Sequence, residues 1–378
     1  MPGRELRARW GGTAVVPVVL AVLGLAGCSA RANRAETAAA PSAASQLAAM
    51  HATWNDVAMP AGTGCAQDST FHIAVHPGDP DKLLVYFNGG GACWRAAECD
   101  PSAHPTYTTR VDTANAPGSG GIFDVANAAN PISGFTMVFV PYCTGDVHLG
   151  SRTVEYVTSG TASRAPHYFS IRHRGGANAD AALAWAFSAV PHPSVVVVAG
   201  SSAGAVPSPV FAERAARRYP DARVVQLGDA AGGYGTSAVP GVLELWGATD
   251  YLRRDPAFSS VAADSLTFEM LYNAAARAAP RVRFAQFNTV EDGTQQYFLS
   301  LLGIRDVPLS RFLSADLAAI RQVNPALRTY TAPGRIHTIL RGNGVYTTTV
   351  DGIAFRDWLA ALVAGREVQN VGERLLTP

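Results

Sequence analysis

The sequence contains a single lysine, Lys82, so arginine carries almost all of its positive charge. Lysine and arginine together number 30, aspartate and glutamate number 29, and the formal net charge is +1. The chain has no basic stripe and no basic cluster rich in aromatic residues. Because nucleic-acid-binding domains carry such positive surfaces, nucleic acid is not an expected partner. Hydrophobic residues make up 48% of the 378 residues, which is enough for a sizeable core.

A hydrophobic run long enough to span a bilayer is also missing near the N-terminus. The apolar run Val15 to Leu25 is shorter than the roughly 20 residues of a membrane-spanning helix. It follows Arg4, Arg7 and Arg9, an order that is typical of a signal peptide. The run ends in Leu25-Ala26-Gly27-Cys28, which resembles the lipobox before the lipidated cysteine of bacterial lipoproteins. An ordinary signal peptide that contains a cysteine is the alternative.

These features predict three parts of the chain. Residues 1–27 are the expected lipoprotein signal peptide, and Cys28 is the expected lipidation site. Residues 28–50 are rich in small side chains and are expected to form a flexible tether. A single catalytic domain is expected over residues 51–378, exported and anchored by lipid on the extracytoplasmic side of a membrane.

Cysteine is scarce, and four of the five cysteines lie within the predicted domain: Cys65, Cys93, Cys99 and Cys143. An exported protein can form disulfides, and the number is even. Three pairings are possible. The short loop between Cys93 and Cys99 favours that pair, which leaves Cys65 with Cys143. The spacing is not that of a zinc site.

The segment Gly-Ser-Ser-Ala-Gly at 200–204 follows the β-branched run 195–198 and precedes a segment of helical composition. A serine between a strand and a helix in a G-x-S-x-G motif is the pattern of a nucleophile elbow. Ser202 is therefore the candidate nucleophile, and a structural turn is the alternative. Pro207 and Pro209 lie where the first helical turns should be, which predicts an irregular helix start.

Short apolar runs alternate with helix-like segments along the chain. The predicted strands are 83–87, 137–140, 195–198, 224–227, 282–287 and 327–330. The predicted helices are about 178–189, 211–219, 266–278, 315–323 and 355–363. Most runs do not alternate apolar with polar residues, which is typical of parallel strands covered on both faces. The pattern predicts an α/β fold with a mainly parallel central sheet, and an active site beyond the carboxyl ends of its strands.

A glycine-rich segment, 88–91, directly follows the predicted strand 83–87. In an α/β-hydrolase such a loop supplies a backbone N–H to the oxyanion hole. A tight turn is the alternative, whereas a Walker loop is excluded because no Gly-Lys-Ser/Thr follows.

Two further candidates complete a possible triad. Asp292 follows the predicted strand 282–287, and His337 is the only histidine after the Gly-Ser-Ser-Ala-Gly motif. The order serine, acid, histidine is that of the α/β-hydrolases. Asp229, which follows the strand 224–227, is a rival for the acid, and Glu291 is a weaker one.

With these residues in view, the chain resembles the pectin acetylesterase/Notum family of serine carboxylesterases. The resemblance spans roughly residues 64–365 and rests on five blocks in the family's order. The blocks are Tyr86-Phe-Asn-Gly-Gly-Gly-Ala-Cys93, Asn130-Pro131 with Val140-Pro-Tyr-Cys-Thr-Gly-Asp146 and Gly150, Gly200-Ser-Ser-Ala-Gly204, Asn288-Thr-Val-Glu-Asp-Gly-Thr-Gln295, and His337-Thr-Ile-Leu340 with Asp357-Trp-Leu359.

The resemblance implies an α/β-hydrolase fold and assigns a role to each candidate residue. Ser202 would be the nucleophile, His337 the base and Asp292 the acid, which favours Asp292 over Asp229. The oxyanion donors would be the backbone N–H groups at Gly90, Gly91 and Ala203. The resemblance also supports the Cys93–Cys99 and Cys65–Cys143 pairing.

One departure from the family concerns the substrate. The family has a tryptophan beside the oxyanion glycines, whereas this chain has Ala92, with Trp94 beyond Cys93. We expect hydrolysis of acyl esters, above all O-acetyl esters of an extracytoplasmic carbohydrate, with no metal or organic cofactor. The alternatives are a hydrolase of lipid or longer acyl esters and a non-catalytic carbohydrate-binding lipoprotein. The expected partners are an acylated small molecule or polysaccharide and, through the lipid anchor, a membrane.

Overall fold

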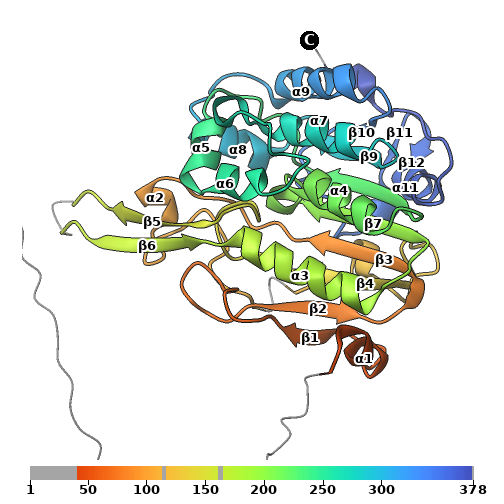
Figure 1. Cartoon of the computed structure of the whole chain (residues 1–378). Helices are drawn as coiled ribbons and strands as arrows, with labels where there is room; N and C mark the ends of the chain where they lie inside the picture. The colour runs from red at the N-terminus through yellow and green to blue at the C-terminus, as the bar shows by residue number, and fades with distance from the viewer. Residues whose placement is uncertain (1–40, 113–115, 161–164, 377–378) are drawn as a thin grey trace, which may run out of the picture. The chain divides into compact units, whose positions relative to one another are not determined.

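The computed structural model describes residues 41–112, 116–160 and 165–376 (Figure 1). The predicted signal peptide and the lipidation site Cys28 lie outside these residues. A central sheet has eight strands in the order β1-β2-β4-β3-β7-β8-β9-β10. The strands are β1 Asn55–Ala58, β2 His72–His76, β3 Asp79–Phe87, β4 Phe135–Val140, β7 Val195–Ser201, β8 Arg223–Asp229, β9 Arg283–Thr289 and β10 Arg328–Ala332.

All six predicted strands are present, and they pair in parallel from β4 through β3, β7, β8 and β9 to β10. The predicted α/β fold with a mainly parallel sheet is thus confirmed. Strands β1 and β2 were not predicted, and they extend the sheet in antiparallel order. Strand β1 is only partly buried, so it lacks the dense apolar run by which the central strands are recognised.

Helices cover both faces of the sheet, which explains why its strands do not alternate. In β3, Leu83, Val85 and Phe87 belong to one core cluster, while Leu84 and Tyr86 belong to another. Helices α3, α4, α7 and α9 contribute to the first cluster and α11 to the second; Figure 1 shows the first group side by side. Their bounds are α3 Gly175–Ala189, α4 Ser208–Arg218, α7 Phe268–Ala278, α9 Leu309–Val323 and α11 Phe355–Val363.

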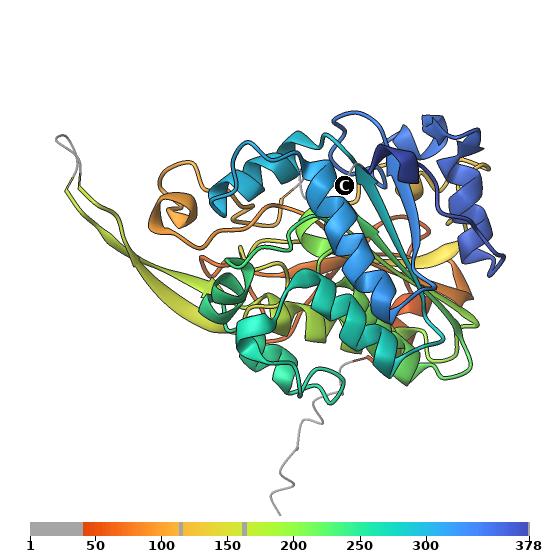
Figure 2. The ribbon, with the colours of Figure 1, turned by 90° about the horizontal axis from the view of Figure 1, so that it is seen from above.

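The remaining elements are shorter or lie apart from the sheet. They are α2 Ala96–Cys99, α5 Val239–Leu245, α6 Ala248–Arg253, α8 Gly293–Leu301, α10 Gly344–Thr347, β11 Thr349–Val350 and β12 Ile353–Ala354. Strands β5 Arg152–Val157 and β6 Tyr168–His173 form a separate antiparallel hairpin that extends away from the central sheet (Figures 1 and 2). Among the described residues, no helix is long and apolar enough to cross a membrane.

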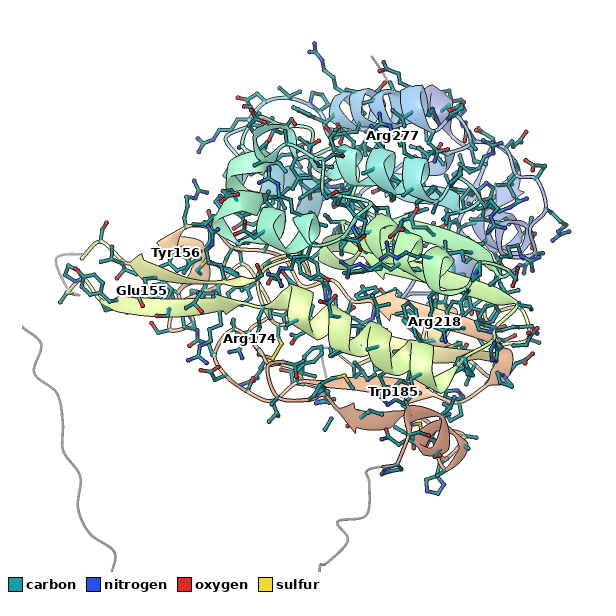
Figure 3. All side chains as sticks on the ribbon, in the orientation of Figure 1. Glu155, Tyr156, Arg174, Trp185, Arg218 and Arg277 are labelled. Atoms are coloured by element: carbon teal, nitrogen blue, oxygen red, sulfur yellow. A yellow bond between two sulfur atoms is a disulfide. The ribbon has the colours of Figure 1, made fainter. Side chains whose placement is uncertain are left out.

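The folded part begins earlier than the predicted boundary at residue 51. Helix α1, Ala43–Ala48, packs on α3, where Trp185 Nε1 donates a hydrogen bond of 3.0 Å to Gln46 Oε1; Figure 3 labels Trp185 on α3. Leu47 and Met50 pack against the core. Residues 41–50 therefore belong to the domain rather than to a tether, because the alanines of this segment favour a helix and its few apolar side chains find a surface to cover.

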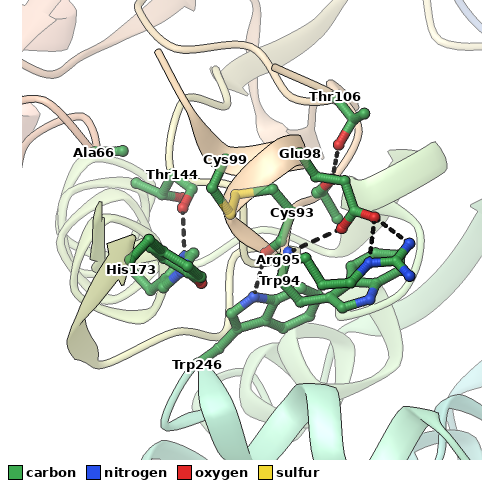
Figure 4. Close-up of a disulfide and its surroundings, with 12 residues drawn as sticks. Ala66, Cys93, Trp94, Arg95, Glu98, Cys99, Thr106, Thr144, His173 and Trp246 are labelled. Atoms are coloured by element: carbon green, nitrogen blue, oxygen red, sulfur yellow. Dashed lines mark hydrogen bonds and ion pairs between the residues drawn. A yellow bond between two sulfur atoms is a disulfide. The ribbon is translucent and has the colours of Figure 1, made fainter. Parts of the chain in front are cut away.

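Both predicted disulfides are present. Cys65 pairs with Cys143, which joins the segment before β2 to the loop after β4. Cys93 pairs with Cys99 and closes the short loop that follows the glycine-rich segment (Figure 4).

Candidate active site

Ser202 stands at the turn that follows β7. Its φ of +53° lies in the left-handed region, which residues other than glycine rarely adopt. A Cβ atom on Gly200 would lie 2.1 Å from the carbonyl oxygen of Gly204, and one on Gly204 would lie 2.0 Å from that of Phe87. Both glycines are therefore required by backbone contacts, and the geometry is that of a nucleophile elbow.

The predicted irregular start of the next helix is confirmed. A 3-10 turn spans Ser202–Gly204, and α4 begins only at Ser208. Pro207 is the residue before the helix, and Pro209 occupies its first turn. Proline is tolerated there because the first N–H groups of a helix have no partner within it.

Asp292 and His337 lie 45 positions apart in the sequence but are in direct contact. They meet because β9 and β10 are parallel neighbours, so the carboxyl ends of both strands lie at the same edge of the sheet. His337 Nδ1 and Asp292 Oδ2 are 2.7 Å apart. The other carboxylate oxygen of Asp292, which caps α8, accepts hydrogen bonds from the backbone N–H groups of Thr294 and Gln295 at 2.9 and 3.0 Å. Asp292 is fully buried, whereas the His337 side chain is 23% exposed. The carboxylate thus fixes one imidazole nitrogen and leaves the other to the pocket.

The glycine-rich loop approaches Ser202 from the carboxyl end of β3. A Cβ atom on Gly89 would lie 2.9 Å from the Ser202 Cβ atom. Gly91 has a φ of +76°, and a Cβ atom there would lie 2.0 Å from a backbone oxygen of Thr106. The loop can therefore bring its backbone close to the serine because its three glycines have no side chains. Gly90, Gly91 and Ala203, the predicted oxyanion residues, all line the space around Ser202.

A buried histidine contacts the backbone of this loop. His148 Nε2 is 2.9 Å from the carbonyl oxygen of Asn88. Burial lowers the pKa of His148 to about 4, so its ring is neutral near pH 7. Its neighbour Val147 has a φ of +50°, and the Val147 N–H donates to the Tyr142 hydroxyl at 2.8 Å. This strained segment lies between Asp146 and Gly150, two residues of the second block on which the family resemblance rests.

Asp229, the rival acid, is not the partner of His337. Its buried carboxylate accepts hydrogen bonds from Ser201 Oγ at 2.6 Å and from the N–H groups of Ile339 and Leu340 at 3.0 Å. Burial raises the pKa of Asp229 to about 6. Asp229 therefore joins the strand that bears the nucleophile to the loop that bears His337. Glu291, the weaker rival, is exposed.

Two pockets meet at Ser202. A polar pocket of about 320 Å³ contains Ser202, His337 and Arg341, together with the glycine-rich loop. Arg341 was not singled out from the sequence, and its place four residues after His337 is the signal that could have revealed it. The second pocket, of about 50 Å³, shares Ser202 and Gly91 with the first but is otherwise almost wholly apolar. Its wall consists of Ala92, Trp94, Val147, Ala203, Val206, Ala230, Tyr234, Val239, Val242, Trp246, Phe268, Phe298 and Leu302.

Trp94 compensates in part for the missing tryptophan at position 92. Ala92 and Trp94 line the same apolar pocket, so the displaced ring still reaches it. The Trp94 ring lies 6.5 Å from that of Trp246 and 6.4 Å from that of Phe298, centroid to centroid. Trp246 is held in turn by a hydrogen bond of 2.7 Å from its Nε1 to the carbonyl oxygen of Cys93 (Figure 4).

Comparison with known proteins shows the family to which the chain belongs. No curated protein sequence matches the chain. A crystal structure of the Wnt deacylase Notum from Drosophila has the same fold, with a TM-score of 0.56 and 16% sequence identity. The match covers 85% of this chain and 96% of that chain. The family model for pectinacetylesterases matches residues 48–236, half of the chain, which include the glycine-rich loop and the Ser202 turn. The chain therefore belongs to the pectinacetylesterase family and is an ester hydrolase with an α/β-hydrolase-like fold.

Proposed function

We propose that the protein is a serine carboxylesterase that removes short acyl groups, acetyl above all, from an extracytoplasmic carbohydrate. The observation that carries the proposal is the 2.7 Å contact between Asp292 and His337 at the edge of the pocket that contains Ser202. A carboxylate on one nitrogen of a histidine that lines the same pocket as a strained serine is the arrangement expected of a serine-hydrolase triad.

The reaction proceeds through an acyl-enzyme. His337 removes the proton from Ser202 Oγ as this oxygen attacks the ester carbonyl, and Asp292 stabilises the imidazolium. The backbone N–H groups of Gly90, Gly91 and Ala203 stabilise the oxyanion, a contribution of roughly 3 kcal/mol per donor in comparable sites. His337 then protonates the departing alcohol, and water releases the acid from Ser202 by the same steps in reverse.

The two pockets separate the two halves of the ester. The leaving alcohol must lie beside the residue that protonates it, and His337 lines the polar pocket but not the apolar one. The alcohol therefore occupies the polar pocket, and the acyl group occupies the apolar pocket. This division suits a carbohydrate, whose hydroxyl groups require polar surroundings, joined to an apolar acyl group.

The size of the apolar pocket predicts the acyl chain length. Its 50 Å³ has room for only about three to five groups of water or methyl size. Acyl groups from acetyl to a few carbons fit this space, whereas a chain of eight carbons exceeds it. We therefore expect kcat/KM to be highest for acetyl esters and to fall steeply by octanoyl, measured on p-nitrophenyl esters of graded length.

A substitution in the wall provides a sharp test of this prediction. Trp94→Ala enlarges the acyl pocket and should move the optimum towards longer chains, whereas Trp185→Ala, remote on α3, should leave the order of substrates as it is. Each methylene that the pocket accepts contributes about 0.8 kcal/mol. A wild-type profile that rises steeply up to octanoyl would favour the lipid-ester alternative. A panel of O-acetylated polysaccharides would then identify the alcohol.

The location of the enzyme is part of the proposal. The two disulfides support an oxidising, extracytoplasmic environment. Mass spectrometry of the mature protein should find lipid on Cys28 and no residues before it, and Cys28→Ala should release the domain in soluble form. A mature chain that starts elsewhere and carries no lipid would contradict the anchor.

A further inference from the structure

Two consecutive residues with a left-handed backbone lie beside the glycine-rich loop. Val147 has a φ of +50° and His148 a φ of +58°. Residues other than glycine rarely adopt this conformation, and a β-branched side chain such as that of Val147 tolerates it least. Backbone strain of this kind is commonly kept at functional sites, where the rest of the fold holds it. The strain therefore points to a function for the side chains that these two residues place.

The two side chains reach different parts of the active site. Val147 lines the apolar pocket. His148 is only 1% exposed, and its Nε2 lies 2.9 Å from the carbonyl oxygen of Asn88, the first residue of the glycine-rich loop. A carbonyl oxygen can only accept a hydrogen bond, so Nε2 carries the proton and donates it. His148 thus holds the start of the loop that carries Gly90 and Gly91, two of the predicted oxyanion donors.

The surrounding core holds the His148 imidazole in place. The centre of its ring lies 4.7 Å from that of Tyr142 and 5.3 Å from that of Phe87. The buried carboxylate of Asp146, two residues earlier, accepts a hydrogen bond of 2.7 Å from the Gly175 N–H at the start of α3. The imidazole is therefore a fixed partner for the loop.

A fixed carbonyl group also fixes the next N–H group along the chain. A trans peptide unit is planar, so its C=O and N–H bonds point in opposite directions. The Asn88 carbonyl is held by His148, and the Gly90 carbonyl accepts a hydrogen bond of 2.8 Å from the Thr108 N–H. The second bond sets the direction of the Gly91 N–H. Because glycine adopts many backbone conformations, a loop without these bonds can turn its N–H groups away from the ester.

We propose that His148 is a positioning residue for the oxyanion hole, which it keeps in the arrangement that stabilises the transition state by holding the Asn88 carbonyl. The inference rests on the proposed function, which assigns the oxyanion to the glycine-rich loop. His148 lines neither of the two pockets that meet at Ser202. Its loss should therefore lower kcat, which depends on contacts made in the transition state, and leave KM nearly unchanged.

The test uses two substrates that differ in one atom: p-nitrophenyl acetate and its thionoester, in which sulfur replaces the carbonyl oxygen. Sulfur is a weak hydrogen-bond acceptor, so the oxyanion hole favours the oxygen ester. His148→Leu has an apolar side chain without the N–H group. It should lower kcat for the oxygen ester about 10- to 100-fold, less than the loss of an oxyanion donor itself. The oxygen-to-sulfur ratio of kcat/KM should fall by a similar factor.

Two amide variants test the hydrogen bond itself. The N–H of the amide in His148→Gln can take the place of Nε2–H, so this variant should recover part of the oxygen-to-sulfur ratio. His148→Asn has the same amide one methylene shorter, falls short of the Asn88 carbonyl and should behave as His148→Leu does. Because both amide variants keep a polar side chain, this pair decides the question even if His148→Leu does not fold. Thermal unfolding followed by circular dichroism reports the stability of each variant.

His173→Leu is the matched control. Like His148, His173 is 1% exposed and has a ring nitrogen 2.9 Å from a backbone carbonyl oxygen, that of Thr144. It lies at the end of β6 and lines neither pocket at Ser202. This variant should lose stability but keep the oxygen-to-sulfur ratio of the wild type. Equal losses on both esters in His148→Leu, or the same ratio in His148→Gln and His148→Asn, would overturn the inference and leave His148 as a residue of the core only.

The two proposals fail in different ways. Labelling of the wild type by a fluorophosphonate probe and turnover of p-nitrophenyl acetate report on the serine esterase alone. If both are present and the oxygen-to-sulfur ratio does not depend on the residue at position 148, only the role of His148 is wrong. If both are absent in folded wild-type protein, the proposed function itself is wrong.

Discussion

Replacing Ser202 by alanine should abolish labelling by a fluorophosphonate probe and lower kcat for acetyl esters a thousand-fold or more. The loss is large because the members of a triad act as a unit, so the histidine and the acid contribute little once the nucleophile is gone. The measurement is probe labelling followed by peptide mapping, together with turnover of p-nitrophenyl acetate. Circular dichroism of the variant checks that the fold is intact.

The neighbouring serine in the same motif is a stringent control. Ser201 Oγ points into the core, where it accepts a hydrogen bond of 2.7 Å from the Tyr86 hydroxyl and donates to Asp229. Ser201→Ala should therefore still react with the probe at Ser202. Labelling at Ser201, or full esterase activity in folded Ser202→Ala, would disprove the assigned nucleophile, and the absence of any labelling in the wild type would favour a binding protein over an enzyme.

Asp292→Asn should lower kcat by about three to four orders of magnitude, because an amide can no longer hold the imidazole in the tautomer that accepts a proton from serine. Asp229→Asn should cost far less, since Asp229 contacts Ser201 and the backbone of the His337 loop rather than the imidazole. Steady-state kinetics on one acetyl ester gives both values under the same conditions.

The two aspartates form a matched pair, because each is fully buried at the carboxyl end of a strand or just beyond it. The thermal stability of both variants should be measured with their kinetics, so that a loss of fold is not taken for a loss of chemistry. A larger kinetic loss in Asp229→Asn than in Asp292→Asn would transfer the role of the acid to Asp229. It would also show that the contact between Asp292 and His337 is only structural.

The six central strands could be predicted because each is a short, continuous apolar run, a pattern that is visible within the strand itself. Strand β7, for example, is buried along its whole length and has the composition of a strand covered on both faces. Strands β5 and β6 could not be predicted in this way. Most of their residues are exposed or only partly buried, and the few buried side chains, such as Tyr156 and Ile171, pack on a small cluster around the Cys93–Cys99 disulfide rather than on the core of the sheet.

Helix α1 could not be predicted from amino-acid composition. Residues 43–48 contain small side chains that are typical of a linker, yet they are equally compatible with a helix. The contact between Gln46 and Trp185 joins residues 139 positions apart, and no local pattern indicates it.

The sequence by itself determined the elements whose causes are local: the strained serine turn with its two glycines, the glycine-rich loop, the parallel strands and the order serine, acid, histidine. The rule that parallel strands end at one edge was enough to bring Ser202, Asp292 and His337 to the same side of the sheet. Only the tertiary structure decided which aspartate contacts His337, because Asp229 stands at the carboxyl end of a strand and Asp292 just beyond one, and the two differ in the groups that each contacts. The same holds for the two pockets, since a cavity is formed by residues from many segments and has no signature in any one of them.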